Sequence, residues 1–217
     1  MAAVTIIGGH GKIALRLARQ LADARHDVTS WIRKADQSAD IEEAGATPAV
    51  LDVESMSVEQ MTEAFHGADL VVWSAGAGGG SPERTVAVDR DAAIRSMDAA
   101  VAAGVPRYVM VSYIGSGPNH GVPQDNPFFA YAQVKTDADA YLRGTALDWT
   151  VLGPSTLTDE TGTGRIDVGD DLESEHVTRD DVATVAAYVV KHDVFARTTV
   201  LFNNGSTPIK QALDAIV

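Results

Sequence analysis

Tyr131 and Lys135 are two side chains that could together perform proton transfer, and they stand four residues apart. Residues at positions i and i+4 of a helix share one face. A cation beside a phenol favours the phenolate and lowers the pKa of the phenol, which makes a tyrosine a usable acid or base near neutrality. We therefore predict that Tyr131 gives or takes a proton and that Lys135 tunes its pKa.

Ser112 comes directly after the apolar run Tyr108–Val111, which predicts a buried strand. Ligands of open α/β sheets bind at the carboxyl ends of the strands, and a serine hydroxyl there can hydrogen-bond a carbonyl oxygen. We therefore expect Ser112 to orient a substrate carbonyl beside Tyr131. The segment Gly115–Pro127 is rich in Gly, Pro and Asn and predicts a substrate loop, in which His120 either contacts substrate or is merely exposed.

A glycine-rich turn follows the first predicted strand, Val4–Ile7, in the pattern G-x-x-G-x-x-A. Gly8 allows a sharp turn off the strand, Gly11 allows the backbone to approach a pyrophosphate, and Ala14 allows the following helix to pack closely. The free N–H groups at the start of that helix suit a phosphate. The pattern predicts dinucleotide binding, and the alternative is a tight strand–helix turn without a ligand.

Two cations end the second predicted strand, Asp27–Ile32, at the place where NAD-specific folds carry an acidic residue. Arg33 and Lys34 would instead hold a ribose 2′-phosphate, and Lys12 and His10 in the glycine loop lie near the same groups. The sequence therefore favours NADP over NAD. The alternative is that these cations are ordinary surface residues.

Two further strand ends complete the predicted cofactor site. Asp52 and Val53 follow the third strand and are expected at the adenine. The small residues Ser74, Ala75 and Gly76 follow the fourth and allow the backbone to approach a ribose, whereas Gly78–Gly80 could be a flexible loop. The predicted cofactor-binding set is Gly8, His10, Gly11, Lys12, Ile13, Arg33, Lys34, Asp52, Val53, Ser74, Ala75, Gly76, Lys135 and Pro154.

Strand and helix signals alternate along the chain, which predicts parallel βαβ units. The predicted strands are Val4–Ile7, Asp27–Ile32, Thr47–Leu51, Leu70–Trp73, Tyr108–Val111, Trp149–Leu152 and Thr199–Phe202. The predicted helices are Lys12–Ala24, Gln37–Ala44, Val58–Phe65, Glu83–Ala103, Phe128–Leu142, Arg179–Val190 and Pro208–Ile216. We predict an α/β fold with a doubly wound parallel sheet of the Rossmann type. Residues 1–217 would form one domain, with about 153–217 as a small substrate-facing lobe.

Composition narrows the class of protein. The 217 residues contain 17 Lys and Arg against 30 Asp and Glu, a net charge of −13, which disfavours nucleic acids and anionic membranes as partners. The chain has no cysteine, and its six histidines show no metal-ligand spacing, so we expect no metal. No apolar run reaches the length of a membrane span and no leader-like segment opens the chain. We expect a cytoplasmic monomer or homodimer that acts on a small molecule.

These motifs together resemble the short-chain dehydrogenase/reductase superfamily, and above all its atypical NAD(P)H-binding branch with the NmrA-like and flavin/biliverdin-reductase-B-like proteins. The resemblance rests on the glycine turn Gly8–Ala14, the fifth-strand segment Ala102–Ser112, the helix with Tyr131 and Lys135, and the sixth-strand segment Leu147–Pro154. One departure is Gly153-Pro154-Ser155, where this branch usually has Arg-Pro-Gly.

The resemblance implies hydride transfer between NADP and a small carbonyl, quinone or flavin-like acceptor, with Tyr131, Lys135 and Ser112 as the catalytic residues. It also leaves two other functions open. One is a non-catalytic sensor that binds NADP(H), since members of this branch often lack the tyrosine. The other is an epimerase or dehydratase that uses a bound cofactor.

Overall fold

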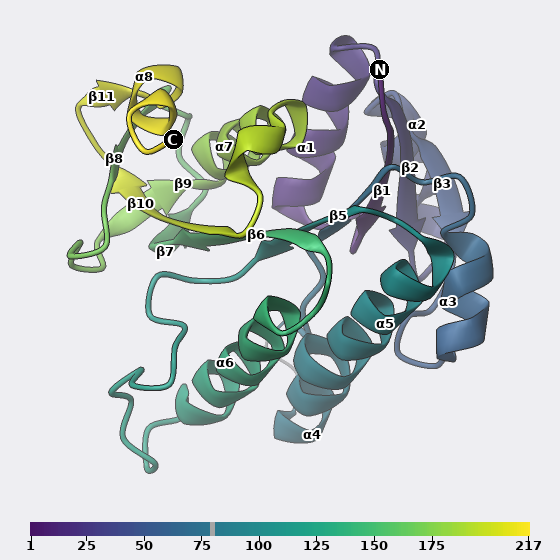
Figure 1. The fold of residues 1–217 in the computed structure, drawn as a ribbon, viewed down its shortest axis with the longest axis horizontal. Coiled ribbons are helices and arrows are strands. Elements are labelled where there is room, and N and C mark those ends of the chain that lie inside the picture. The colour runs from purple at the N-terminus through teal and green to yellow at the C-terminus, as the bar shows by residue number, and fades with distance from the viewer. Residues whose placement is uncertain (79–80) are drawn as a thin grey trace.

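A computed structural model describes residues 1–78 and 81–217, so the expected glycine loop lies partly outside the described residues. Nine strands of the described part form one sheet in the order β11-β8-β10-β6-β5-β4-β1-β2-β3 (Figure 1). They are β1 (Ala3–Ile7), β2 (Asp27–Ile32), β3 (Thr47–Val50), β4 (Leu70–Trp73), β5 (Arg107–Val111), β6 (Asp148–Pro154), β8 (Arg165–Val168), β10 (Thr198–Asn204) and β11 (Thr207–Pro208). The strands from β3 to β10 in this order are all parallel, and β8 and β11 extend the edge in antiparallel pairing.

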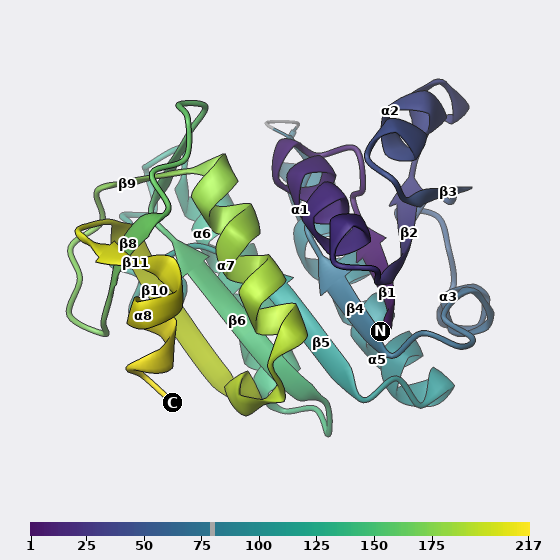
Figure 2. The ribbon, with the colours of Figure 1, turned by 90° about the horizontal axis from the view of Figure 1, so that it is seen from above.

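Helices cover both faces of the sheet (Figure 2). They are α1 (Lys12–Asp23), α2 (Ser38–Glu43), α3 (Val58–Ala64), α4 (Pro82–Thr85), α5 (Ala93–Ala103), α6 (Phe129–Arg143), α7 (Arg179–Lys191) and α8 (Ile209–Asp214), and a π-helical segment, Val86–Ala92, joins α4 to α5. One face carries α1 and α7 side by side, and the other carries α3, α5 and α6. The Rossmann-type fold class predicted from the sequence is confirmed.

Alternation along the strands explains why two separate cores form. Side chains of a strand point to opposite faces in turn. In β4, Leu70 and Val72 join the core under α1 and α7, whereas Val71 and Trp73 join the core under α3, α5 and α6. Every residue of this strand is buried, as a parallel strand covered on both faces requires.

Four short strands escaped the sequence analysis. Two of them, β7 (Thr156–Thr158) and β9 (His176–Thr178), pair in parallel as a small second sheet, and β8 and β11 lie at the edge of the main sheet. Each has four residues or fewer, which is too short for an alternation such as that of Ile166 and Val168 in β8 to predict a strand, so its structure depends on distant partners. Within residues 153–217, β8, β10 and β11 continue the main sheet rather than form a separate layer.

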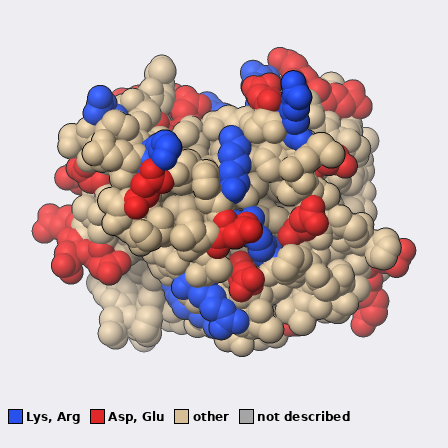
Figure 3. Space-filling model, turned by 45° about the horizontal axis from the view of Figure 1, so that its top comes forward, with Lys and Arg blue, Asp and Glu red and all other residues tan. Residues whose placement is uncertain are grey.

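Charged residues of both signs are interspersed over the face shown in Figure 3, where lysines and arginines lie next to acidic groups. Ion pairs of the described residues include Arg90 with Asp91 and Arg107 with Asp193. Among the described residues, no helix combines the length and the apolar character that crossing a membrane requires.

Candidate functional site

The glycine turn between β1 and α1 has the geometry that its sequence predicts. Gly8 has a φ of +80°, and a Cβ atom there would lie 2.5 Å from the Cα atom of Ala75. Gly11 is the N-cap of α1, and in the described part of the chain no side chain caps this helix. Its first N–H groups and the positive end of its dipole are therefore open to an anion. Gly9, which sequence analysis missed, packs on β2, because a Cβ there would lie 2.6 Å from that of Ser30.

The first cavity lies at the carboxyl ends of β1, β2 and β4 and measures about 260 Å³. Predicted cofactor residues from four separate segments meet in it. Those that line it are Gly8, His10, Gly11, Arg33, Asp52, Val53, Ser74, Ala75 and Gly76. The sequence analysis missed other lining residues, among them Trp31, Gln37, Glu54 and Arg84.

Two arginines of the first cavity differ in their partners. Arg84 contacts Glu54 at 3.3 Å and donates to the carbonyl oxygen of Ala77 at 2.5 Å. Arg33 is exposed and makes no ion pair within residues 1–78 and 81–217. Its guanidinium is therefore available to an anionic group in this cavity. Arg84 lies inside a predicted helix, and its position in the sequence does not indicate that it lines a cavity.

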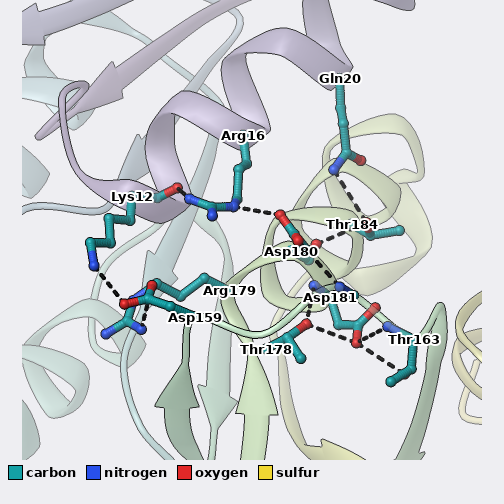
Figure 4. Close-up of polar contacts among 11 residues, drawn as sticks. Lys12, Arg16, Gln20, Asp159, Thr163, Thr178, Arg179, Asp180, Asp181 and Thr184 are labelled. Atoms are coloured by element: carbon teal, nitrogen blue, oxygen red, sulfur yellow. Dashed lines mark hydrogen bonds and ion pairs between the residues drawn. The ribbon is translucent and has the colours of Figure 1, made fainter.

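Three predicted cofactor residues stand outside the linings of both cavities described here: Lys12, Lys34 and Pro154. Figure 4 shows where the Lys12 ammonium goes, because it contacts Asp159 at 2.5 Å, and Asp159 also contacts Arg179 at 2.9 Å. This contact ties the glycine turn to the segment after β7. The ring of His10 lies in the first cavity but contacts Asp40 at 2.6 Å.

The second cavity, of about 500 Å³, adjoins the first, since Ser74, Ala75 and Gly76 line both. It brings together all three predicted catalytic residues, Ser112, Tyr131 and Lys135. Ile13 also lines it, as does Leu157 from the predicted substrate-facing lobe. His120 is not in the lining, and its ring instead contacts that of Phe129, with a centroid distance of 5.5 Å.

The surroundings of Lys135 and Tyr131 differ from those that the sequence predicted for an acid–base pair. The Lys135 side chain is almost fully buried, and its Nζ donates to the carbonyl oxygen of Val111 at 3.0 Å. Burial raises the pKa of the Tyr131 phenol far above its ordinary value, and the carboxylates of Asp89 and Asp139 raise it further. The predicted lowering of this pKa by Lys135 is therefore wrong. The phenol is held in its protonated form.

Ser112 also differs from its prediction. Its Oγ donates to Oδ2 of Asp139 at 2.6 Å, and both residues are buried. A hydroxyl has one proton, so this bond leaves Ser112 with only lone pairs for a ligand. The predicted hydrogen bond from Ser112 to a substrate carbonyl therefore stays a prediction that would require this proton to be released, and Tyr131 is a predicted donor for that oxygen that also lines the cavity.

Asp89 is a buried acidic residue that the sequence analysis missed. It lies in the π-helical segment, lines the second cavity and accepts a hydrogen bond from the N–H of Ala77 at 2.9 Å. Burial raises the pKa of its carboxyl above the ordinary value, although the Lys135 ammonium opposes this shift. The sequence signal that could have found Asp89 was a carboxylate directly after the apolar Val88 inside a predicted helix. Segments of π-helix are frequent at functional sites.

Aromatic rings form one wall of the second cavity. The ring of Phe128 lies 5.1 Å from that of Tyr131 and 5.5 Å from that of Tyr113, measured between centroids. Phe128 and Tyr131 line the cavity, and Phe128 remains 43% exposed. Large apolar rings that stay accessible at a cavity suit a flat ligand, which can stack on them.

Gly153, where the sequence departs from the family pattern, has a close side-chain neighbour. A Cβ atom at this position of β6 would lie 2.4 Å from Cδ2 of Leu201 on β10. A larger side chain at position 153 would therefore require Leu201 to move.

Comparison with known proteins identifies a family and a similar protein. Residues 8–193 match a family described as NAD(P)H-binding. The uncharacterized sugar epimerase YhfK of Bacillus subtilis is 34% identical over 213 residues, which cover 97% of this chain and 98% of that protein.

Two solved structures are similar over nearly the whole chain. A Bacillus halodurans protein provisionally named an NAD-dependent epimerase/dehydratase has a TM-score of 0.92 and 29% identity, over 99% of this chain and 100% of its own. The oxidoreductase ylbE of Lactococcus lactis has a TM-score of 0.88 and 29% identity, over 99% of this chain and 96% of its own. The predicted resemblance to the atypical NAD(P)H-binding dehydrogenase/reductases is confirmed.

Proposed function

The chain belongs to the NAD(P)H-binding family, and from this premise we propose that it is an NADP-dependent oxidoreductase that reduces a small flat carbonyl, quinone or flavin-like acceptor. The observation that carries the proposal is a protonated phenol, that of Tyr131, in a cavity that adjoins the glycine turn. The first cavity then takes the nucleotide and the second takes the acceptor.

The residues present fit a dinucleotide. The uncapped N-terminus of α1 suits the pyrophosphate, the backbone of Ser74–Gly76 joins the two cavities, and the accessible Arg33 suits a ribose 2′-phosphate. The reduced nicotinamide supplies a hydride when it is bound. Preference for NADP rests on Arg33, because a charge-assisted contact to the 2′-phosphate has no equivalent in NAD.

The second cavity holds the proton donor that reduction requires. Tyr131 stays protonated near neutrality, so it can give its proton to the carbonyl oxygen of the acceptor as that oxygen gains charge. Lys135 fixes α6 against β5 through the carbonyl oxygen of Val111 and keeps a positive charge near Asp89. The rings of Phe128 and Tyr131, which both line the cavity, hold a flat acceptor.

A sugar epimerase is the second candidate, favoured by the names of two relatives. Epimerisation through a ketone intermediate begins with the removal of a hydroxyl proton, which requires Tyr131 as a base. The raised pKa of its phenol opposes that role. This observation ranks reduction first.

Turnover with NADPH tests the proposal. We expect oxidation of NADPH with at least one member of a panel of quinones, flavins and aromatic aldehydes, and slower turnover with NADH. Gly11→Val is the control, because Gly11 has an extended φ of −65° that valine also adopts, while a side chain there blocks the approach of the pyrophosphate. The variant should keep its circular dichroism and lose NADPH binding. Interconversion of sugar epimers without net NADPH consumption would contradict the proposal.

A further inference from the structure

Asp139 is a fully buried carboxylate on α6 that does not itself line the second cavity. Its Oδ2 accepts hydrogen bonds from the hydroxyls of Ser112, at 2.6 Å, and Ser116, at 2.5 Å. Its Oδ1 is buried and has no hydrogen-bond partner among the described residues. Both oxygens of a buried carboxylate normally accept hydrogen bonds, so a buried carboxylate with one unpaired oxygen calls for an explanation.

The hydrogen-bond pattern fixes the direction of the Ser112 hydroxyl. Two hydroxyls, those of Ser112 and Ser116, donate to the same oxygen of Asp139. The single proton of Ser112 therefore lies in the bond to Asp139. Ser112 also lines the second cavity, where its oxygen offers only lone pairs.

We infer that Asp139 fixes Ser112 as a hydrogen-bond acceptor, so that the preferred acceptor substrate carries an O–H or N–H donor beside its reacting carbonyl. Beside the Lys135 ammonium and the Asp89 carboxylate, the second cavity then presents the Tyr131 phenol as a donor and the Ser112 oxygen as an acceptor. That pair complements an α-hydroxy carbonyl compound, whose carbonyl accepts from Tyr131 while its hydroxyl donates to Ser112. Asp139 is a positioning residue, since it acts through Ser112.

The inference rests on the proposed function in one respect: it takes the carbonyl beside the donor to be the group that is reduced. In that reaction the carbonyl carbon gains the hydride of NADPH and the carbonyl oxygen gains the Tyr131 proton. NADPH becomes NADP⁺, and the ketone becomes an alcohol. The hydrogen bond to Ser112 transfers no atom, so it affects binding and specificity.

Binding of three matched probes tests the inference. With NADP⁺ at saturation, calorimetry gives the Kd of 2-hydroxyacetophenone, of acetophenone, which lacks the donor, and of 2-methoxyacetophenone, in which a methyl group replaces the donated proton. We expect the wild type to bind the hydroxyl compound about tenfold more tightly than either of the others, the size of effect that one buried hydrogen bond gives.

Asp139→Leu separates positioning from a general structural role. The variant frees the Ser112 proton, so we expect weaker binding of 2-hydroxyacetophenone together with equal or tighter binding of acetophenone. Damage to the fold would weaken both ligands by the same factor. Ser112→Ala should remove the preference as well, and it serves where Asp139→Leu does not fold. Ser116→Ala is the matched control: it removes the other hydroxyl on the same Oδ2 and should keep the preference.

Three results would overturn the inference: equal Kd values for the three probes in the wild type, a preference that survives in Ser112→Ala, or no binding of any probe to the NADP⁺-loaded protein. Turnover distinguishes this failure from failure of the proposed function. If NADPH reduces hydroxylated and plain ketones with equal kcat/KM, the oxidoreductase proposal stands and the inference fails. If the binding preference appears but no probe or panel compound is reduced, the oxidoreductase proposal fails.

Discussion

The two adjoining cavities differ in how they hold their charges. The first carries its charges within reach of solvent: Arg33 is exposed, and the side chains of the ion-paired Arg84 and Glu54 are each 32% exposed. The second carries charges that solvent hardly reaches, since Lys135 is 1% exposed and Asp89 2%. Exposed charges attract a ligand and contribute little to folding. Buried charges shift each other's pKa and couple the chemistry to the stability of the fold.

This difference separates the expected effects of mutations. A change in the first cavity should alter cofactor affinity and leave stability and chemistry nearly intact. A change in the second should alter turnover, stability or pH dependence, with little effect on the selection between NADPH and NADH.

The largest effect is expected from Tyr131→Phe, which keeps the ring of the aromatic wall and removes the proposed proton donor. Turnover should fall by about 10²–10⁴, the usual contribution of general acid–base catalysis. The Kd of NADPH should stay within about twofold, because Tyr131 lines only the second of the two cavities. Steady-state kinetics and cofactor titration check this. Unchanged turnover in a folded Tyr131→Phe protein would mean that the proton comes from solvent.

Lys135→Met should come next and should act on stability. It removes the hydrogen bond to Val111 and leaves the buried Asp89 carboxylate without its cation, a loss of up to about 3 kcal/mol in the free energy of unfolding. With the cation gone the pKa of Asp89 rises further, so the variant binds a proton more readily than its unfolded chain does. Its stability should therefore recover as the pH falls, and Asp89→Asn in the same chain should restore part of it at neutral pH. Denaturant unfolding of the single and double variants at several pH values measures both effects.

Arg33→Ala tests the contrasting behaviour of the first cavity. Loss of a charge-assisted contact to the 2′-phosphate should weaken NADPH binding by roughly 1.5–3 kcal/mol, and NADH binding should not change. The free energy of unfolding should stay within about 0.5 kcal/mol, since the side chain is exposed. Lys34→Ala is the matched control, because Lys34 neighbours Arg33 but does not line the cavity. Equal affinity of the wild type for both cofactors would remove the assignment to NADP.

The same division explains what the sequence could predict. The glycine turn is local: Gly8, Gly11 and the following helix stand within one strand–turn–helix unit, so residue types alone predicted its shape. The seven strands with apolar character and all the predicted helices appear within a few residues of their predicted bounds. In contrast, β8 and β11 form by pairing with distant strands, and the two alternating apolar residues of β8, Ile166 and Val168, are too few to predict that pairing.

Tertiary packing also decided the details of the second cavity. The spacing of Tyr131 and Lys135 correctly placed both side chains at one cavity. The spacing could not reveal that Lys135 would bond the Val111 carbonyl, or that Asp89 would approach from another helix. The direction of the pKa shift of Tyr131 was wrong because burial raises the pKa of the phenol and the carboxylates of Asp89 and Asp139 add to that shift.

The smallest expected effect is in the pH dependence of reduction, and it distinguishes a buried phenol from an ordinary one. A phenol with the usual pKa of about 10 would be half ionised at pH 10, so its capacity to donate a proton would fall about twofold between pH 7 and pH 10. The pKa of Tyr131 lies well above that value, because burial, Asp89 and Asp139 all favour the protonated form. The reductive kcat should therefore stay flat to pH 10 under saturating NADPH and acceptor. Asp139→Asn removes one of the two carboxylates and should move the alkaline fall of kcat to lower pH. Stability provides the control, since a group with a raised pKa stabilises the fold fully below the pKa of the unfolded phenol and loses that contribution as the pH rises through the folded pKa. A fall of kcat centred near pH 7 to 8 in a protein that remains folded would show that the phenol of Tyr131 is not held protonated.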